Sequence, residues 1–312
     1  MIAAALQTPL SLVRSPKTEQ EPIPVRHMKF EFDAKSVDDK FLLNTELASA
    51  YFEALSIFLT FGEDLVIDTA RYHRQFVDDP VLKQRVTSLI GQEAVHSKAH
   101  NEWNDMLQLN RFPVSIYRFL AQQVFDYGFK QLPNPMQLSL MAGIEHFTAV
   151  MAEFFMKHED MFFSTDDEKQ RALWMWHMLE ESEHKDIAYD VFQELSGSYP
   201  LRIAGFAMAF GTILGLIPLA TSVIPFYRRP RNLISPAFWK DAKRSVGVLF
   251  GKKDGVYGST IGHVLDYLRR DFHPNDHDTS EYLEYYKETL LHPETGLLTP
   301  YLVKETVPPL RK

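Results

Sequence analysis

The chain has 312 residues, a formal net charge of −8, 45% hydrophobic residues and no cysteine. The hydrophobic content excludes a disordered chain, and the length allows a large core with an appendage. Without cysteine, the chain has no disulfide, thiolate metal site, iron–sulfur cluster or cysteine nucleophile, and no basic stripe indicates nucleic-acid binding.

Residues 1–28 contain four prolines and are expected to form a flexible lead-in. The apolar start is short, lacks a preceding basic region and runs into Thr8-Pro9, which does not fit a secretory signal. We therefore expect a cytoplasmic protein.

Apolar residues at three- and four-residue steps predict helices over residues 44–76 and 80–109, with Asp79-Pro80 between them. Further helices are predicted over 114–132 and 136–159. Ser164 to Glu168 is typical of a helix start, and this helix is expected to reach about residue 195. No segment alternates with period two, so we expect an all-α fold with almost no strand.

Two Glu-x-x-His motifs dominate the chain, Glu93 to His96 and Glu181 to His184. Residues three positions apart share one face of a helix. Glu63 and Glu145 lie on two further predicted helices. Four such helices would bring four carboxylates and two imidazoles around one point, which is the ligand set of a dinuclear metal site in a four-helix bundle.

The charge balance also indicates metal ions. Buried carboxylates are costly unless they are paired, and two divalent cations would neutralise four of them. Oxygen and nitrogen ligands suit iron, manganese or zinc, and we expect two iron ions. Glu93 and Glu181 are the expected bridges, with Glu63 and Glu145 as terminal ligands.

Other polar residues near the motifs could orient ligands or carry protons. These candidates are His100, His177, Tyr127, Asp186 and Asp190. Glu180 and Glu183 flank the second motif and are expected to be solvated or paired to Lys185. Most of the Met and Phe residues around the motifs are expected in the core, and some of them would line an apolar pocket.

Residues 201–312 are expected to form a C-terminal extension to a bundle over residues 29–200. Residues 203–226 carry no charge and could cross a bilayer by length, with arginines following. Pro218 weakens a straight span, so the alternatives are an apolar helix in contact with a membrane or a hairpin packed on the bundle. A short helix is expected near Tyr282 and Tyr286, and the tail ends as proline-rich coil.

The order of the candidate ligands resembles that of the ferritin-like di-iron carboxylate proteins, such as the ribonucleotide reductase small subunit and acyl-carrier desaturases, over about residues 45–195. More narrowly, residues 61–63, 92–101, 144–148 and 180–185 resemble a bacterial family catalogued as predicted metal-dependent hydrolases. The resemblance implies a ferritin-like four-helix bundle with additional helices. The metal ligands that it implies are Glu63, Glu93, His96, Glu145, Glu181 and His184.

Three functions stay open at this stage. The first is a di-iron oxidoreductase that activates O2 to oxidise a small apolar, lipid-like substrate with the help of an electron donor protein. The second is a metal-dependent hydrolase that uses a metal-bridging hydroxide. The third is a non-catalytic iron-binding or ferroxidase protein. Ligand type favours the first, and membrane-surface contact through 203–226 and a homodimer are further expectations.

Overall fold

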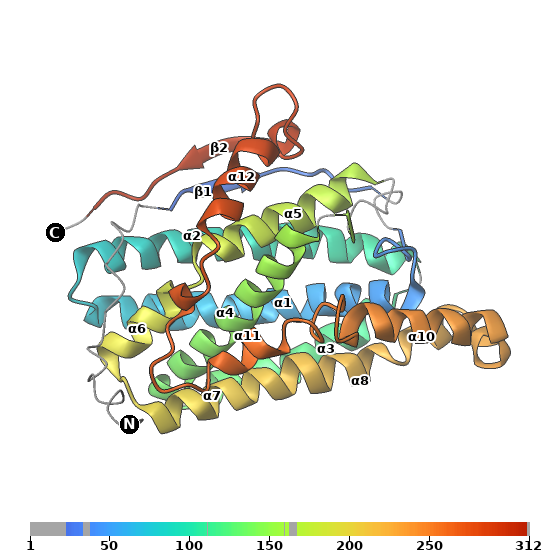
Figure 1. Cartoon of the computed structure of the whole chain (residues 1–312), viewed down its shortest axis with the longest axis horizontal. Coiled ribbons are helices and arrows are strands. Elements are labelled where there is room, and N and C mark those ends of the chain that lie inside the picture. Colours follow the sequence, from blue (N-terminus) through green and yellow to red (C-terminus); the bar gives the residue numbers. More distant parts are fainter. Residues whose placement is uncertain (1–22, 34–37, 111, 159, 162–166, 311–312) are drawn as a thin grey trace, which may run out of the picture.

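The computed structural model describes residues 23–33, 38–110, 112–158, 160–161 and 167–310. These residues are mostly helical, with one small two-stranded sheet, which confirms the all-α prediction. Four helices surround the centre of the molecule: α1 (Glu46–His73), α2 (Pro80–Leu107), α4 (Asn134–Lys157) and α5 (Glu168–Glu183). Helix α1 packs on α2 and α4, and α5 packs on α4 and α2, so the four close a ring (Figure 1).

Local sequence explains where these helices begin. The Asp79 carboxylate accepts hydrogen bonds from the backbone N–H groups of Val81 and Leu82, and Pro80 occupies the first turn. Asp167 caps α5 in the same way by accepting from the N–H of Gln170. The earlier part of the predicted start, residues 164–166, lies outside the described residues.

Two predicted helices end earlier than expected. Helix α3 (Val114–Phe125) stops before residue 132, and only a 3-10 turn over Phe129–Gln131 follows. The predicted helix to residue 195 is broken into α5 and α6 (Ile187–Leu195). Tertiary pairing holds the break: the Lys185 ammonium donates to the His277 carbonyl at 2.6 Å, and Asp186 pairs with Arg85 at 2.8 Å.

The apolar run after the bundle does not fold back as a hairpin, and it packs on the bundle with one side while the other stays exposed. Helix α7 (Tyr199–Gly211), a π-helical turn (Thr212–Leu216), α8 (Ile217–Thr221) and α9 (Ile224–Arg228) follow one another along the bundle (Figure 1). Pro218 lies in the first turn of α8, where a missing N–H is tolerated.

Two helical segments of the described chain are long and apolar enough to span a membrane, judged by length and composition alone. One is α4, whose most apolar window is 89% buried, which marks it as a core helix. The other is the run from Tyr199 to Arg228, whose window is 33% buried.

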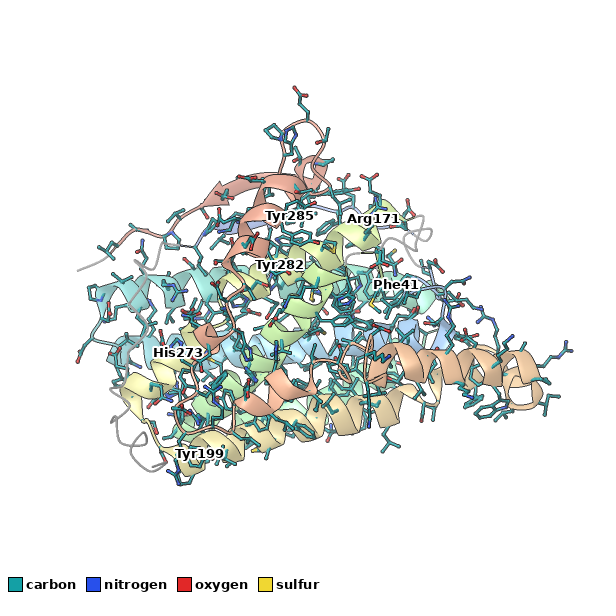
Figure 2. All side chains as sticks on the ribbon, viewed as in Figure 1. Phe41, Arg171, Tyr199, His273, Tyr282 and Tyr285 are labelled. Carbon is teal, nitrogen blue, oxygen red and sulfur yellow. The ribbon has the colours of Figure 1, made fainter. Side chains whose placement is uncertain are left out.

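The C-terminal part wraps the bundle. It contains a 3-10 turn (Pro230–Ile234), α10 (Pro236–Phe250), α11 (Ile261–Asp266), a second 3-10 turn (Pro274–Asp276), α12 (Ser280–Leu290) and strand β2 (Leu302–Thr306). Helix α12 agrees with the short helix expected near Tyr282. His273, between α11 and α12, lies on the outside of the bundle (Figure 2) and bonds to Asp190 at 2.9 Å.

A small antiparallel sheet joins the two ends of the described chain. Strand β1 (Val25–Met28) pairs with β2, with Val25 opposite Thr306, and β1 packs on α2. The predicted lead-in therefore needs a new boundary: residues 1–22 lie outside the described residues, whereas residues 25–28 form a strand held by this pairing. The same pairing makes part of the predicted C-terminal coil a strand.

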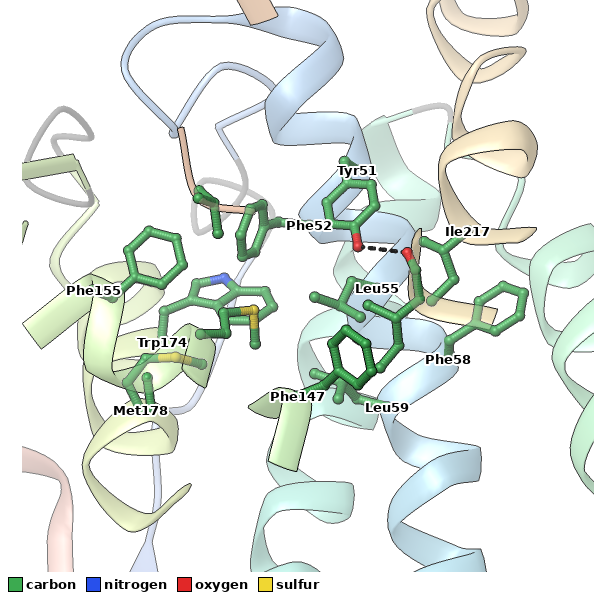
Figure 3. Packing of buried hydrophobic residues seen from close by; sticks show 14 of the residues in the cluster. Tyr51, Phe52, Leu55, Phe58, Leu59, Phe147, Phe155, Trp174, Met178 and Ile217 are labelled. Atoms are coloured by element: carbon green, nitrogen blue, oxygen red, sulfur yellow. Dashed lines mark hydrogen bonds between the residues drawn. The ribbon is translucent and has the colours of Figure 1, made fainter. Parts of the chain in front are cut away.

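Large aromatic side chains fill the core beside the centre of the bundle. Trp103, Trp174 and Trp176 are completely buried. Figure 3 shows Phe52 and Phe155 around Trp174, and the Phe52 and Trp174 rings meet edge to face at 5.3 Å. This packing keeps water away from the polar residues described next.

Candidate metal centre

The structure brings all six predicted ligands to one buried place. Glu63 comes from α1, Glu93 and His96 from α2, Glu145 from α4 and Glu181 from α5, and His184 directly follows α5. We call these six residues the Glu/His cluster; each side chain is at most 4% exposed. The break after Glu183 thus falls at one of its members.

His184 lies between three of the carboxylates. Its Nδ1 is 3.2 Å from Glu145 Oε2 and 3.4 Å from Glu93 Oε1, and its Nε2 is 3.6 Å from Glu181 Oε1. Groups of three ligand atoms that lie within 4.8 Å of one another can be drawn from Glu93, Glu181 and His184. This half of the cluster has the size of a metal site.

His96 forms the other half. Its Nδ1 is 3.9 Å from Glu93 Oε2 and 3.8 Å from Glu181 Oε1, and Glu63 joins Glu93 and His96 within 4.8 Å. Glu93 and Glu181 therefore approach both imidazoles. This placement fits the bridging roles expected for them, although metal binding itself stays a prediction.

The donor set fits two divalent cations. Several of its buried atoms have no hydrogen-bond partner among the described residues, and such atoms are costly unless something binds them. They are both carboxylate oxygens of Glu63, Glu93 Oε1, Glu145 Oε2, Glu181 Oε2, His96 Nδ1 and both ring nitrogens of His184. Two cations would satisfy these atoms and balance the four carboxylates.

In the absence of cations, protons bound to the cluster would offset part of its negative charge. Burial, together with the neighbouring Glu93 carboxylate, raises the pKa of Glu63 well above its usual value, and burial does the same for Glu145. Burial lowers the pKa of His184, but the Glu181 and Glu145 carboxylates outweigh it and raise this pKa to about 10. The carboxylates around His184 therefore favour its protonated form in the metal-free protein.

An arginine from β1 supports His96 from the side away from the cluster. His96 Nε2 lies 2.9 Å from Glu180 Oε2, and Arg26 donates to Glu180 at 3.0 Å and to Glu183 at 2.7 Å. Glu180 and Glu183 are thus buried and paired to Arg26, which corrects the expectation that they are solvated or paired to Lys185. This chain of contacts fixes the imidazole so that Nδ1 faces the cluster.

Sequence reasoning missed Arg26, which lies 154 residues from Glu180. The available signal was indirect. Helix α5 is apolar or aromatic on more than one face, with Trp174 and Trp176 on different sides of it, so glutamates flanking its motif needed a buried partner.

His100 and His177 lie beside the cluster, as expected. His177 Nε2 is 3.0 Å from Glu181 Oε1, and its Nδ1 is 2.8 Å from His100 Nε2. The His100 Nδ1 lies 2.7 Å from the Ser56 hydroxyl. Burial keeps the pKa of His100 well below its usual value, so this imidazole is neutral and can relay hydrogen bonds.

Three other candidates do not reach the cluster. The Tyr127 side chain follows α3 and is 65% exposed, because α3 ends before this residue. Asp186 is buried against Arg85 and Asn275 at 2.8 and 3.0 Å, and Asp190 bonds to His273. These residues hold the C-terminal part onto the bundle instead of orienting the cluster.

An apolar cavity of about 40 Å³ lies next to the cluster. Gly62 and Ile144, which line it, directly precede Glu63 and Glu145. The other lining residues come from α1, α3 and the 3-10 turn after it, α4, the apolar run and the loop after α10: Leu55, Phe58, Leu59, Phe125, Phe129, Phe147, Thr148, Met151, Ala209, Thr212, Ile213, Ile217 and Tyr257. The cavity favours an uncharged apolar group close to the cluster.

Of the comparisons with known proteins, the one with family models gives a match. No curated protein and no solved structure matches the chain, so the expected ferritin-like relationship stays a prediction. A family model described as "Predicted metal-dependent hydrolase" matches residues 24–278, from the residue before β1 to just past the 3-10 turn Pro274–Asp276. This description supports metal dependence and agrees with the hydrolase alternative better than with the oxidoreductase expected first. The match covers well over half of the chain, and the chain therefore belongs to the predicted metal-dependent hydrolase family.

Proposed function

We propose that the chain is a metal-dependent hydrolase in which the Glu/His cluster holds two divalent cations and the adjacent cavity receives an apolar part of the substrate. The family description supports the reaction class. The single observation that carries the rest is the set of buried, unpartnered carboxylate and imidazole atoms near an apolar cavity, whose lining residues Gly62 and Ile144 directly precede Glu63 and Glu145. A cytoplasmic location is part of the proposal.

When bound, the cations would supply Lewis acidity and lower the pKa of a coordinated water. The protein's own residues would do the positioning. Arg26 and Glu180 hold His96 from one side, and His100 holds His177 against Glu181. Residues fixed in this way lose little freedom on binding a cation, which favours a defined coordination geometry.

The cavity limits the substrate class. Its walls are almost entirely aliphatic and aromatic, with hydroxyl groups of Thr148, Thr212 and Tyr257 as the polar exceptions. A charged group would lose its hydration there without compensation. A short apolar acyl group fits better, in an ester or amide whose C–O or C–N bond faces the cluster. Water then adds its OH to the acyl carbon and its H to the leaving group.

Oxidation by O2 is a second candidate, and the donor set favours it. Four carboxylates and two imidazoles are a hard, oxygen-rich set that suits iron or manganese. The dry apolar cavity would also suit an unactivated hydrocarbon group. This candidate needs an electron donor. A protein that only binds and oxidises ferrous iron, without turning over an organic substrate, is its non-catalytic form.

One experiment separates these functions. Protein purified without added metal is analysed for its metal content and reloaded anaerobically with zinc, manganese or ferrous iron. Hydrolysis of p-nitrophenyl esters of increasing acyl length is then followed without O2. Anaerobic hydrolysis that needs two metals and disappears in Glu93→Ala supports the proposal.

The other outcomes are equally defined. Consumption of O2 by the ferrous protein with oxidation of an apolar substrate, and no ester or amide cleavage with any metal, would replace hydrolysis by the second candidate. Oxidation of iron without any substrate turnover would indicate a ferroxidase. Glu153→Gln serves as the matched control, because Glu153 is a buried glutamate of α4 outside the cluster.

A further inference from the structure

One side of the molecule is both apolar and basic. It follows the run from Tyr199 to Arg228 into α10 (Figures 1 and 2). The most apolar window of the run has a mean hydropathy of 2.0 and is only 33% buried, and no charged residue lies between Arg202 and Arg228. We call this side the outer face. Its exposed apolar side chains are Leu219, Val223, Tyr227, Leu233, Ile234, Trp239, Val246 and Phe250.

The opposite side of the run is fastened to the bundle along its length. Helix α7 packs on α4, and α8, α9 and α10 pack on α1. At Gly205 the backbones are so close that a Cβ would lie 2.4 Å from the Ser139 carbonyl carbon. The Tyr51 hydroxyl donates to the Ile213 carbonyl at 3.1 Å (Figure 3). The run therefore lies flat on the bundle, which favours lying along a membrane over crossing it.

Helix α10 has the pattern of a helix that lies in a membrane interface. Trp239, Val246 and Phe250 are exposed and fall on one face by their spacing of seven and four residues. Lys240 and Lys243 are exposed beside them. An apolar stripe with flanking basic residues is the signature of interfacial helices. Ring contacts of Phe226 with Phe238 and Trp239, at 5.2 and 5.9 Å, join α9 to α10.

The charge of this region is opposite to that of the chain. Residues 228–254 contain eight Lys or Arg and two Asp, a net charge of +6, whereas the whole chain has −8. Most of these cations are exposed, and six have no ion pair among the described residues. They are Arg231, Lys240, Lys243, Arg244, Lys252 and Lys253.

We propose that the outer face docks on an anionic lipid bilayer. Its apolar side chains enter the boundary between headgroups and acyl chains, and its lysines and arginines bind lipid phosphates. The cytoplasmic leaflet supplies such lipids. A second copy of the chain fits this face poorly, because a two-fold contact would set one basic region against the other.

Docking does not depend on the proposed hydrolysis, but it has a consequence for it. Ala209, Ile213 and Ile217 of the same run line the cavity beside the Glu/His cluster. One helical layer therefore separates the lipid-facing side from the cavity. If the proposed function holds, apolar substrates dissolved in the bilayer have a short path to the cluster.

Trp239 is a built-in reporter of docking. Among the four tryptophans, Trp103, Trp174 and Trp176 are completely buried, whereas Trp239 is 54% exposed. The full chain is mixed with vesicles of phosphatidylcholine, with and without phosphatidylglycerol. We expect co-sedimentation with the anionic vesicles that weakens at high salt, a blue shift of tryptophan emission, and quenching by brominated lipid that is lost in Trp239→Phe.

A matched pair of variants tests the charges. Reversal at two sites of the outer face, Lys240→Glu with Lys243→Glu, should weaken vesicle binding at least about tenfold, since each cation near an anionic surface contributes about 1 kcal/mol. Reversal of two exposed cations elsewhere, Arg71→Glu with Lys98→Glu on α1 and α2, changes the net charge equally and should keep binding close to that of the parent.

Three results would overturn the proposal. The first is no binding to anionic vesicles at low salt by protein whose circular dichroism shows it folded. The second is equal loss of binding in both charge variants. A dimer in analytical ultracentrifugation that shields Trp239 from an aqueous quencher would instead assign the outer face to a second copy. None of these measurements uses enzymatic activity, so failure of the proposed function leaves the test intact.

Discussion

Within the described residues, two segments have the length and hydropathy of membrane helices, and they lie in opposite environments. Helix α4 has the lower mean hydropathy, 1.2, and is 89% buried, whereas the run from Tyr199 to Arg228 has 2.0 and is 33% buried. The less apolar helix is the core helix. It contacts α1, α5, α6, α7, α11 and α12, while the run contacts the bundle with one side only.

In both segments, the residues whose polarity does not match their burial are the candidate functional residues. Glu145 and His146 lower the hydropathy of α4, and Glu145 is a member of the Glu/His cluster. In the run, apolar residues such as Leu219 stay exposed although the solvent penalises them. A buried carboxylate such as Glu145 and a cluster of exposed apolar side chains both cost free energy when nothing binds them. A bound cation would offset the first cost, and a partner surface would offset the second.

Glu145→Ala tests the polar side of this comparison and should have the largest effect. The variant removes one carboxylate that lies 3.2 Å from His184, so we expect the metal content to fall from two ions to one or none. Metal-dependent turnover should fall more than about 100-fold, beyond the effect typical of residues that only support ligands. Metal analysis after dialysis and a turnover assay provide the measurement.

The control for this variant lies on the same helix. Glu153→Gln changes a glutamate that is also buried but pairs with Lys157 and His263. We expect it to retain two metal ions in the Glu/His cluster. Because Glu153, His263 and His277 could themselves hold an ion, metal-dependent turnover is compared as well as metal content. Equal loss of both in the two variants would make the assignment of Glu145 as a ligand fail.

Arg228→Met tests how the exposed run is held in place. Arg228 ends α9, is buried, and makes two hydrogen bonds of 2.7 Å to the Glu53 carboxylate, which is completely buried on α1. Removal of the arginine leaves that carboxylate unpaired, which should cost about 3–5 kcal/mol of the free energy of unfolding. Urea denaturation measures it.

A nearby arginine provides the contrast. Arg231 is exposed, and Arg231→Ala should change the free energy of unfolding by less than about 0.5 kcal/mol. Similar losses in the two variants would show that the run is fastened by its general charge and not by the buried pair of Arg228 with Glu53.

The features of this molecule that could be predicted from the sequence are those that depend on local residue patterns. The helices α1, α2 and α4 follow from apolar periodicity, and the start of α2 also follows from its cap at Asp79. The approach of Glu63 to Glu93 and His96 follows from their positions on two paired helices. These features depend on residues close in sequence. The boundary at residue 28 was placed from the local prolines, and the pairing of Val25–Met28 with β2 moves it. The boundary at residue 200 stays a prediction.

The failures share a cause, which is pairing between residues far apart in the chain. Arg26 and Glu180 meet across 154 residues, and Arg85 holds the break at Asp186 across 101. No local window contains both partners of either pair. Tyr127 was expected within a helix reaching residue 132, but α3 ends at Phe125 and the Tyr127 side chain is exposed.

Metal binding should compete with protons in the Glu/His cluster. The pKa of His184 is about 10 in the metal-free protein, and those of Glu63 and Glu145 are raised. Ligands bind cations in their deprotonated form, so metal loading at neutral pH should release at least the His184 proton. Affinity should rise with pH, by up to about tenfold per unit for each proton released. Titration with zinc in a weakly buffered solution measures the release, and tighter binding on acidification would contradict it.

Leu219→Ala should have the smallest effect on stability, and it probes the apolar side of the comparison. The Leu219 side chain is 71% exposed on α8, so its removal should change the free energy of unfolding by less than about 0.5 kcal/mol. The matched change in the core helix, Leu140→Ala on α4, removes a fully buried side chain and should cost about 2–5 kcal/mol. Urea denaturation compares the two. A large loss at Leu219 would mean that this residue is covered by protein in solution, and the outer face would then be an internal or subunit contact instead of a lipid-facing surface.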